Sequence, residues 1–111
     1  MRYRTKFNNQ KIVTPDGKFD SKKEYKRWLE LKEMEAQGKI TNLMRQVPFE
    51  LVPHQKHNGK VIELAVKYYA DFTYEVDGVR IVEDTKGVKT DVYKIKRKLM
   101  LERYGIRIKE V

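Results

Sequence analysis

The chain of 111 residues has no cysteine, which excludes disulfide bonds and thiolate metal sites. Its two histidines, His54 and His57, lie in a polar stretch and make a poor zinc site, because zinc needs at least three protein ligands. No apolar run approaches the roughly 20 residues that span a bilayer. The first six residues lack the apolar stretch of a signal peptide. We therefore expect one soluble domain, residues 1–111, in the cytoplasm and with no membrane partner.

Positive charge is what the chain has in excess. Lys and Arg number 25 against 16 Asp and Glu, a net charge of +9. This balance favours a polyanion such as nucleic acid as the partner, with general solubility as the alternative explanation. Residues 1–13 are basic and polar, and we expect a mobile arm or an irregular lead-in there. The cations of this arm are Arg2, Arg4, Lys6 and Lys11, and a second basic segment runs from Lys86 to Arg103.

Capping signals predict two helices. Ser21 with Glu24 three residues later has the pattern of a capping box, and it opens a helix that runs to about Gln37 before Gly38. Thr90 or Asp91 caps a second helix, which ends at Gly105 after Tyr104.

Alternating segments predict strands between and after these helices. Segment 40–46 enters the sheet weakly, 47–53 suits an edge because it contains two prolines, and 61–64 is either a short strand or loop. Segment 66–76 alternates clearly, and the Asp77-Gly78 turn joins it to 79–86 as a hairpin. A last strand, 106–111, follows the second helix as a crossover to a central strand. The order predicts an α/β (α+β) fold with a mixed sheet flanked by two helices. The even-numbered residues that we expect on one face of 66–76 are Val66, Tyr68, Ala70, Phe72, Tyr74 and Val76.

Two carboxylates end the strands of this hairpin. Asp71 lies six residues before Asp77 and Asp84 six after Gly78, so a two-residue loop makes them near cross-strand neighbours. Like charges in that position destabilise a sheet, and a bound cation offsets the repulsion. Lys86 shares a strand face with Asp84, roughly 7 Å along the chain. The alternative is a solvated face on which Lys86 is only a salt-bridge partner.

The acids Glu83 and Asp84 point to opposite faces of their strand. Asp84 shares a face with Val82, and Asp71 interrupts an aromatic stretch. Carboxylates in apolar surroundings need partners or a metal. We therefore prefer Asp84 to Glu83 as the second acidic ligand, although a β-bulge would reverse the choice.

Each helix carries charge inside its predicted apolar stripe. At about 100° per residue, Glu24 lies within the stripe of the first helix, so it either only caps the helix or also faces the sheet. On the second helix Lys96 and Arg103 lie inside the stripe, where they either snorkel to water or, for Lys96, contact phosphate. The two expected stripes are Tyr25, Trp28, Leu29, Leu31 and Met34, and Val92, Tyr93, Ile95, Leu99, Met100 and Tyr104.

Five segments together resemble the PD-(D/E)XK nuclease superfamily, and more closely a family of short basic phage and prophage proteins placed in it. One departure is that Ala70 stands where the motif has proline. The segments are Phe19-Asp20-Ser21-Lys22-Lys23-Glu24, Gln46-x-Pro48-x-x-Leu51, Tyr69-Ala70-Asp71-Phe72, Val82-Glu83-Asp84-Thr85-Lys86-Gly87 and Thr90-x-x-Tyr93-Lys94-x-Lys96.

The resemblance implies a restriction-endonuclease-like core in the order α-β-β-β-α-β and an active enzyme. It implies that Asp71 and Asp84 bind Mg²⁺, for which Mn²⁺ substitutes, and that Lys86 is the superfamily's lysine. Glu24 matches the acid on the first helix of many members. With these roles we expect the Thr85 carbonyl as a third ligand. The residues expected to support the site or hold DNA are Gln46 and Tyr93, and Lys89, Lys94, Lys96, Arg2, Arg4 and Lys6.

The expected function is magnesium-dependent hydrolysis of DNA phosphodiester bonds. No helix-turn-helix or zinc finger reads base edges, so we expect recognition of DNA structure, as by a branched-DNA endonuclease or Holliday junction resolvase in phage recombination or replication. A junction needs two symmetric cuts, which favours a homodimer in the host cytoplasm. The alternatives are a non-specific or site-specific duplex endonuclease, a non-catalytic DNA-binding subunit of a larger complex, and a purely structural basic protein.

Overall fold

Helix α1 (Lys22–Ala36) begins where the capping pattern predicts it. The Ser21 hydroxyl accepts a hydrogen bond from the Glu24 amide at 3.1 Å. The Glu24 carboxylate turns back and accepts from the amide of Asp20 at 3.3 Å, one residue before the cap. This computed structural model describes residues 11–111, so the predicted DNA contacts of Arg2, Arg4 and Lys6 lie outside the described residues.

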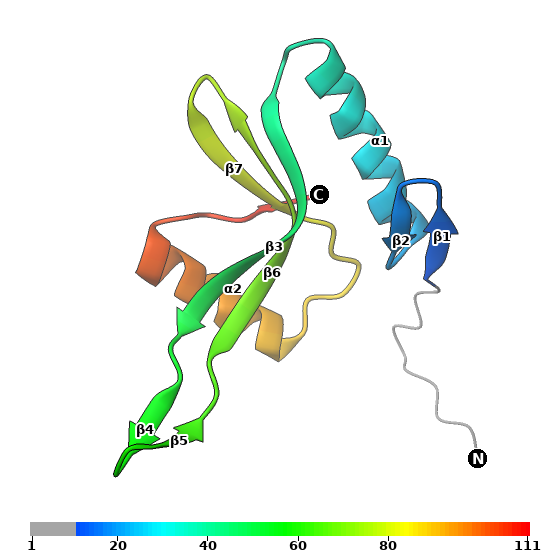
Figure 1. Ribbon diagram of the computed structural model, residues 1–111. Helices are drawn as coiled ribbons and strands as arrows, with labels where there is room; N and C mark the ends of the chain where they lie inside the picture. Colours follow the sequence, from blue (N-terminus) through cyan, green and yellow to red (C-terminus); the bar gives the residue numbers. More distant parts are fainter. Residues whose placement is uncertain (1–10) are drawn as a thin grey trace, which may run out of the picture.

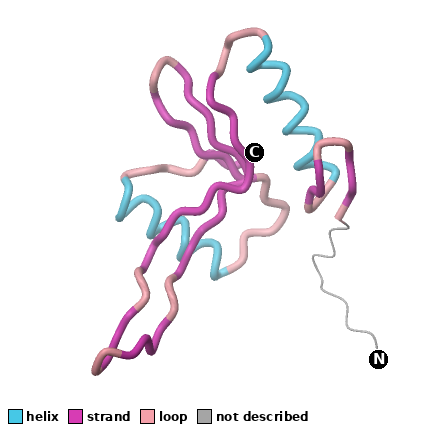
Figure 2. Tube along the Cα trace, in the orientation of Figure 1, coloured by secondary structure: helices cyan, strands magenta, loops and turns pink. Residues whose placement is uncertain are grey.

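The remaining elements form a mixed α+β fold around one four-stranded sheet (Figures 1 and 2). The strands β3 (Thr41–Val52), β6 (Val66–Val76) and β7 (Val79–Asp84) pair antiparallel in that order. Helix α2 (Asp91–Tyr104) then returns the chain so that β8 (Lys109–Glu110) pairs parallel to β7. The predicted mixed sheet with two helices is confirmed, and the crossover follows from the helix between two parallel strands. Within the described residues, no helix is long and apolar enough to cross a membrane.

A tight turn sets the register of the central hairpin. Asp77 and Gly78 both have positive φ, 51° and 80°, as a type I′ turn requires. The pairing of Phe72 with Glu83 follows from that turn. One residue further along, Asp71 and the end of β7 at Asp84 lie opposite each other.

Several boundaries differ from the sequence predictions. The end of the expected lead-in, residues 12–13, is part of a hairpin of β1 (Ile12–Thr14) and β2 (Gly17–Phe19). Segments 40–46 and 47–53 form one continuous strand, β3, and it lies at the edge of the sheet, as the two prolines predict. The polar loop contains β4 (Gln55–His57) and β5 (Lys60–Glu63), which pair as an exposed extension. The final strand is only two residues long.

The residues expected on one face of β6 are divided between two cores. Tyr68 and Ala70 belong to the cluster that includes Tyr93 and Met100 of α2. Phe72 and Tyr74 belong to the cluster that includes Leu31 of α1. The expectation of a single face is therefore wrong. The change falls between Ala70 and Phe72, where the partner strand β3 contains Gln46 with a left-handed φ of 51°. The regular alternation is interrupted at this point, so the two halves of β6 pack against different helices.

The predicted apolar stripes were too wide. Leu29 on α1 is 44 % exposed, and on α2 Val92 and Ile95 are 62 % and 57 % exposed. The buried residues of α2 are Tyr93 and Met100. A chain of 111 residues forms too small a core to cover every apolar side chain, so part of each stripe faces solvent.

A buried ion pair joins α1 to β7. Arg27 donates to both carboxylate oxygens of Glu83, at 2.8 Å and 2.6 Å, and the Tyr74 hydroxyl also donates to Glu83. The Glu83 side chain is fully buried. The hydrogen bonds with Glu83 raise the pKa of Arg27, so the guanidinium stays charged. Glu83 is therefore a structural residue that fastens α1 to the sheet.

We expect Arg27→Met to lower the free energy of unfolding by about 3 kcal/mol, because it leaves the Glu83 carboxylate buried without its main partner. Urea denaturation at pH 7 measures the loss. Glu30, an exposed partner of Arg27, provides the control, and Glu30→Gln should cost less than about 1 kcal/mol. Equal losses in the two variants would contradict a structural role for the buried pair.

Candidate active site

Asp71 and Asp84 lie side by side at the end of the central hairpin. One oxygen of Asp71 accepts from the Thr85 amide at 2.8 Å and from the Thr85 hydroxyl at 2.9 Å. Asp84 accepts from the Tyr68 hydroxyl at 2.6 Å, and its other oxygen lies 3.7 Å from the Lys86 ammonium. The structure thus brings the two aspartates, Lys86 and Thr85 together, as the sequence predicts.

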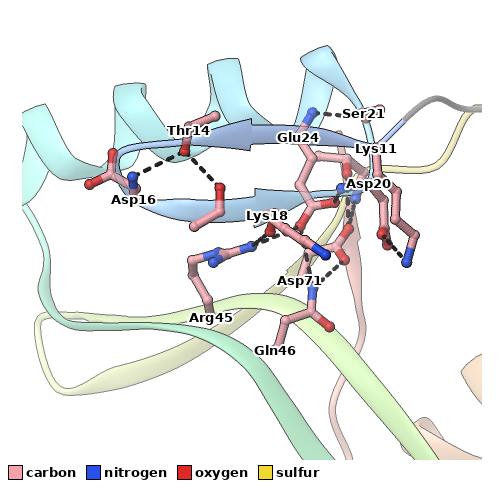
Figure 3. Close-up of polar contacts among 12 residues, drawn as sticks. Lys11, Thr14, Asp16, Lys18, Asp20, Ser21, Glu24, Arg45, Gln46 and Asp71 are labelled. Atoms are coloured by element: carbon pink, nitrogen blue, oxygen red, sulfur yellow. Dashed lines mark hydrogen bonds and ion pairs between the residues drawn. The ribbon is translucent and has the colours of Figure 1, made fainter.

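Gln46 joins this pair to the first helix. Its side-chain amide donates to Glu24 at 3.3 Å and to Asp71 at 3.4 Å. Figure 3 shows these contacts, with Glu24 at the start of α1 and Gln46 beside Asp71. Gln46 has a φ of 51°, the left-handed region that costs a non-glycine residue about 1–3 kcal/mol. Glu24 therefore serves both as part of the helix cap and as a neighbour of the aspartates.

Arg45 is a neighbour of the site that sequence reasoning missed. Its guanidinium lies 3.9 Å from Glu24 and 3.7 Å from the centre of the Phe19 ring. Tyr68, the hydrogen-bond donor to Asp84, was also missed. No local sequence pattern distinguishes Arg45 or Tyr68, because each contacts a residue at least 16 positions away: Arg45 contacts Glu24, and Tyr68 contacts Asp84.

Glu83 lies outside the site, on the face of β7 that packs against α1. Its carboxylate is occupied by Arg27, while Asp84 faces Asp71. Strand alternation alone explains the difference, since successive side chains point to opposite faces. The preference for Asp84 over Glu83 agrees with this placement, and no bulge in β7 reverses it.

Two carboxyl groups of the site have raised pKa values. Burial, together with the negative charges of Asp71 and Asp20, raises the pKa of Glu24 to about 7. Burial and the adjoining Asp71 likewise raise the pKa of Asp84 to about 7. Arg45 and Lys86 act in the opposite direction but do not offset these effects. In the absence of a cation, both carboxyl groups therefore retain a proton to a large extent at neutral pH, where ordinary carboxyl groups are fully ionised.

The donor set fits a magnesium ion held by two carboxylates. One Asp84 oxygen is buried and accepts no hydrogen bond in the described part of the chain. An unsatisfied buried carboxylate oxygen is costly, and a cation would satisfy it. Across residues 11–111, no three His, Cys, Asp or Glu side chains lie close enough to hold a metal between them. Asp71 and Asp84 remain as a pair, which suits Mg²⁺ because it keeps several waters as ligands.

The aspartates open onto a cleft that continues along α2. A cleft of about 250 Å³ contains Asp71, Asp84 and Lys86 in its wall. A neighbouring cleft of about 270 Å³ shares Lys86 and Thr90 with it, and Lys96 is its other charged residue. The Lys86 ammonium lies 4.7 Å from the centre of the Tyr93 ring, so Tyr93 supports the lysine. We call this neighbouring space the Lys96 cleft.

The two other predicted DNA contacts in the described part of the chain, Lys89 and Lys94, do not line this cleft. Lys89 lies 3.5 Å from Glu110. Lys94 is exposed on α2 and lines neither of the two clefts. Of the predicted lysines within residues 11–111, Lys86 and Lys96 lie together in the wall of one cleft.

A family model described as "Protein of unknown function (DUF1064)" matches residues 4–110. No curated protein and no solved structure matches the chain. Any function therefore has to be argued from the site itself.

We expect the stability of the metal-free protein to decrease between pH 5 and pH 8. The folded-state pKa values of Glu24 and Asp84 are near 7, above their ordinary values of 4.5 and 3.8. The folded protein thus holds more protons than the unfolded chain in this range. Stability present below about pH 4 is lost as pH rises through 7.

The test compares urea denaturation of wild type and Asp84→Asn at pH 5 and pH 8 in a chelator. We expect the variant to have the shallower decrease and to exceed wild type at pH 8 by on the order of 2 kcal/mol. Glu102→Gln, an exposed change on α2, is the control. Parallel pH profiles for wild type and Asp84→Asn would contradict the raised pKa.

Magnesium should raise the thermal stability of the wild type at pH 8 and have little effect on Asp71→Asn/Asp84→Asn. A ligand that binds only the folded state stabilises it by about 2.7 kcal/mol at 100 times its Kd. Differential scanning calorimetry over a magnesium titration measures this without any assay of activity. Equal shifts in both proteins would mean that the aspartates do not hold the ion.

Proposed function

This chain belongs to the family described as protein of unknown function (DUF1064), and we propose that it is a magnesium-dependent nuclease that hydrolyses DNA phosphodiester bonds. The observation that carries the proposal is the pair of adjoining aspartates, one oxygen of which is buried and unsatisfied, beside Lys86 in a chain of net charge +9. A basic chain attracts a polyanion. A buried carboxylate pair next to a lysine is suited to chemistry on its phosphate.

The order of elements supports a restriction-endonuclease-like core. The elements α1, β3, β6, β7, α2 and β8 follow one another in the order that the PD-(D/E)XK resemblance implies. In this proposal the hairpins β1–β2 and β4–β5 are additions to that core. Asp71 and Asp84 lie at the end of its central hairpin, where the resemblance expects the acidic ligands.

Asp71 and Asp84 would hold the ion, with the Thr85 carbonyl as a further ligand and Glu24 reaching it directly or through water. When bound, magnesium polarises a phosphoryl oxygen and lowers the pKa of a water molecule. Lys86 orients the attacking water and stabilises the negative charge that builds on the phosphate. Lys96 binds the DNA backbone in the cleft that shares Lys86. Gln46 positions the carboxylates of Glu24 and Asp71 relative to each other.

A structure-selective endonuclease acting on branched DNA in the cytoplasm is the form of this activity that we propose first. The chain has no base-reading motif, which favours recognition of shape over sequence. A binding subunit without catalysis fits the site less well. Such a protein has no use for a buried carboxylate pair, which repels phosphate and raises the pKa of Asp84 at the expense of stability.

Lys86→Ala should lower the rate of DNA cleavage at least about 100-fold, the effect of removing one group that stabilises transition-state charge. Binding should change little, since one cation among many is lost. The assay incubates the protein with magnesium and linear, flapped and four-way DNAs under single-turnover conditions. Lys39→Ala is the matched control, because Lys39 is exposed and forms no ion pair among the described residues.

Cleavage by Lys86→Ala at the wild-type rate would show that the lysine has another role. Absence of product from the wild type on all three DNAs would favour the non-catalytic binding subunit. Selective cutting of the four-way DNA would support a junction resolvase, and equal cutting of the linear duplex would support the duplex endonuclease.

A further inference from the structure

Helix α2 has a basic residue on each side of its buried line. Tyr93 and Met100 define that line. At about 100° per residue, Lys96 and Arg97 lie about 50° to either side of it, both half-buried. The helix therefore meets the rest of the protein along two seams. The Lys96 cleft follows one seam, and a different cleft follows the other.

This second cleft lies between α2 and the β8 segment, and we call it the β8 groove. Its volume is about 480 Å³, and its wall contains four cations and one acid. It shares no residue with the aspartate cleft or with the Lys96 cleft. The lining residues are Arg97, Lys98, Leu101, Arg107, Ile108, Lys109 and Glu110.

The acid of the β8 groove is already satisfied by its neighbours. Glu110 accepts from the Tyr93 hydroxyl at 2.7 Å and from Arg97 at 2.9 Å. The Tyr93 hydrogen bond, supported by Arg97 and Lys89, holds the pKa of Glu110 below its ordinary value. Glu110 therefore stays ionised and compensates the charge of Arg97 rather than that of the whole groove.

Two cations of the groove have no acidic partner. Lys98 and Arg107 are exposed, and neither forms an ion pair within residues 11–111. Lys109 has one acidic neighbour, Glu83 at 3.9 Å, but the charge of Glu83 is already compensated by Arg27 at 2.6 Å. The groove thus presents positive charge to solvent, with arginines whose planar guanidinium suits a phosphate.

We propose that the β8 groove binds the phosphate backbone of a second DNA arm, while the cleaved strand lies across the aspartate and Lys96 clefts. This inference rests on the proposed function. A helix with its side chains is about 10–12 Å across, so α2 separates the two basic seams by about its own width. Two backbones that diverge around the helix fit this arrangement, as they do where two arms of a branched DNA meet.

Tyr93 connects the β8 groove to the Lys96 cleft. Tyr93 donates its hydroxyl to Glu110 at the β8 groove, while its ring lies beneath Lys86 at the other seam. Both sites are held by one buried side chain on one helix. Their separation is therefore set by the fold, and this favours DNAs whose arms diverge by the matching distance.

The test is Lys98→Glu/Arg107→Glu, measured by fluorescence anisotropy with a flapped DNA, a four-way DNA and a linear duplex of equal length in EDTA. We expect affinity for the branched DNAs to fall at least about tenfold, with the slope of log Kd against log salt reduced by roughly 2. Affinity for the linear duplex should fall less than about threefold. Lys39→Glu/Lys60→Glu, at two exposed lysines that line none of the three clefts, controls for the same change in net charge. The cleavage rate of the linear duplex at saturating protein should be unchanged.

The outcomes separate this inference from the proposed function. Equal losses on branched and linear DNA would overturn the second-arm assignment, because the groove would then contact any duplex. A loss no greater than that of Lys39→Glu/Lys60→Glu would overturn the groove as a phosphate site. If the wild type neither binds nor cuts any of the DNAs, the proposed function fails. If the wild type cuts DNA but the groove variant binds branched DNA as well as the control does, only the inference is overturned.

Discussion

The constraint on which this molecule depends is the meeting of two carboxylates across a pair of strands. The Asp77-Gly78 turn fixes the register, and the register brings Asp71 opposite Asp84. Side chains of this kind repel each other, and burial strengthens the repulsion. The surrounding groups donate hydrogen bonds to these acids, Thr85 and Gln46 to Asp71 and Tyr68 to Asp84, while Lys86 lies 3.7 Å from the other Asp84 oxygen without a hydrogen bond to it. One oxygen of Asp84 is still left without a partner.

Glu83 and Asp84 are adjacent on β7, but their carboxylates have different surroundings. Glu83 is buried against α1, where Arg27 forms two hydrogen bonds with it and Tyr74 a third. Asp84, one residue later, faces a cleft and has only a lysine at 3.7 Å as a cation. A fully paired acid contributes to structure. An acid that is buried, incompletely paired and open to a cleft is a candidate for chemistry. Burial alone would not have distinguished the two.

Much of the fold and site could be predicted from sequence because the signals are local. Ser21, Thr90 and Gly105 act at helix ends, and Asp77-Gly78 acts at a turn, within a few residues in each case. The aspartate pair then follows from counting residues on either side of that turn. The face of Glu83 follows from alternation. These predictions need no knowledge of how the elements pack.

The features that were missed depend on packing over long separations. Alternation in β6 predicts that its even-numbered residues share one face, but not that the alternation is interrupted between Ala70 and Phe72, so that one half packs against α2 and the other against α1. Helical periodicity places Val92 and Ile95 in a stripe, but not which part of the stripe the sheet covers. The resemblance predicted Gln46 as a supporting residue, but not its hydrogen bonds to Glu24 and Asp71, which depend on a left-handed backbone for which sequence carries no reliable signal.

The distribution of charge connects the site to the kind of partner that we propose. The protein is strongly basic, yet its buried aspartate pair is a local concentration of negative charge that Lys86 only partly compensates. A surface that merely binds phosphate gains nothing from such a pair, because the aspartates repel the same ligand that the lysines attract. The arrangement becomes favourable when a divalent cation joins the aspartates and the phosphate, since it then compensates both. In the function that we propose, the basic seams along α2 attract the DNA and the acidic centre between the helices performs the chemistry.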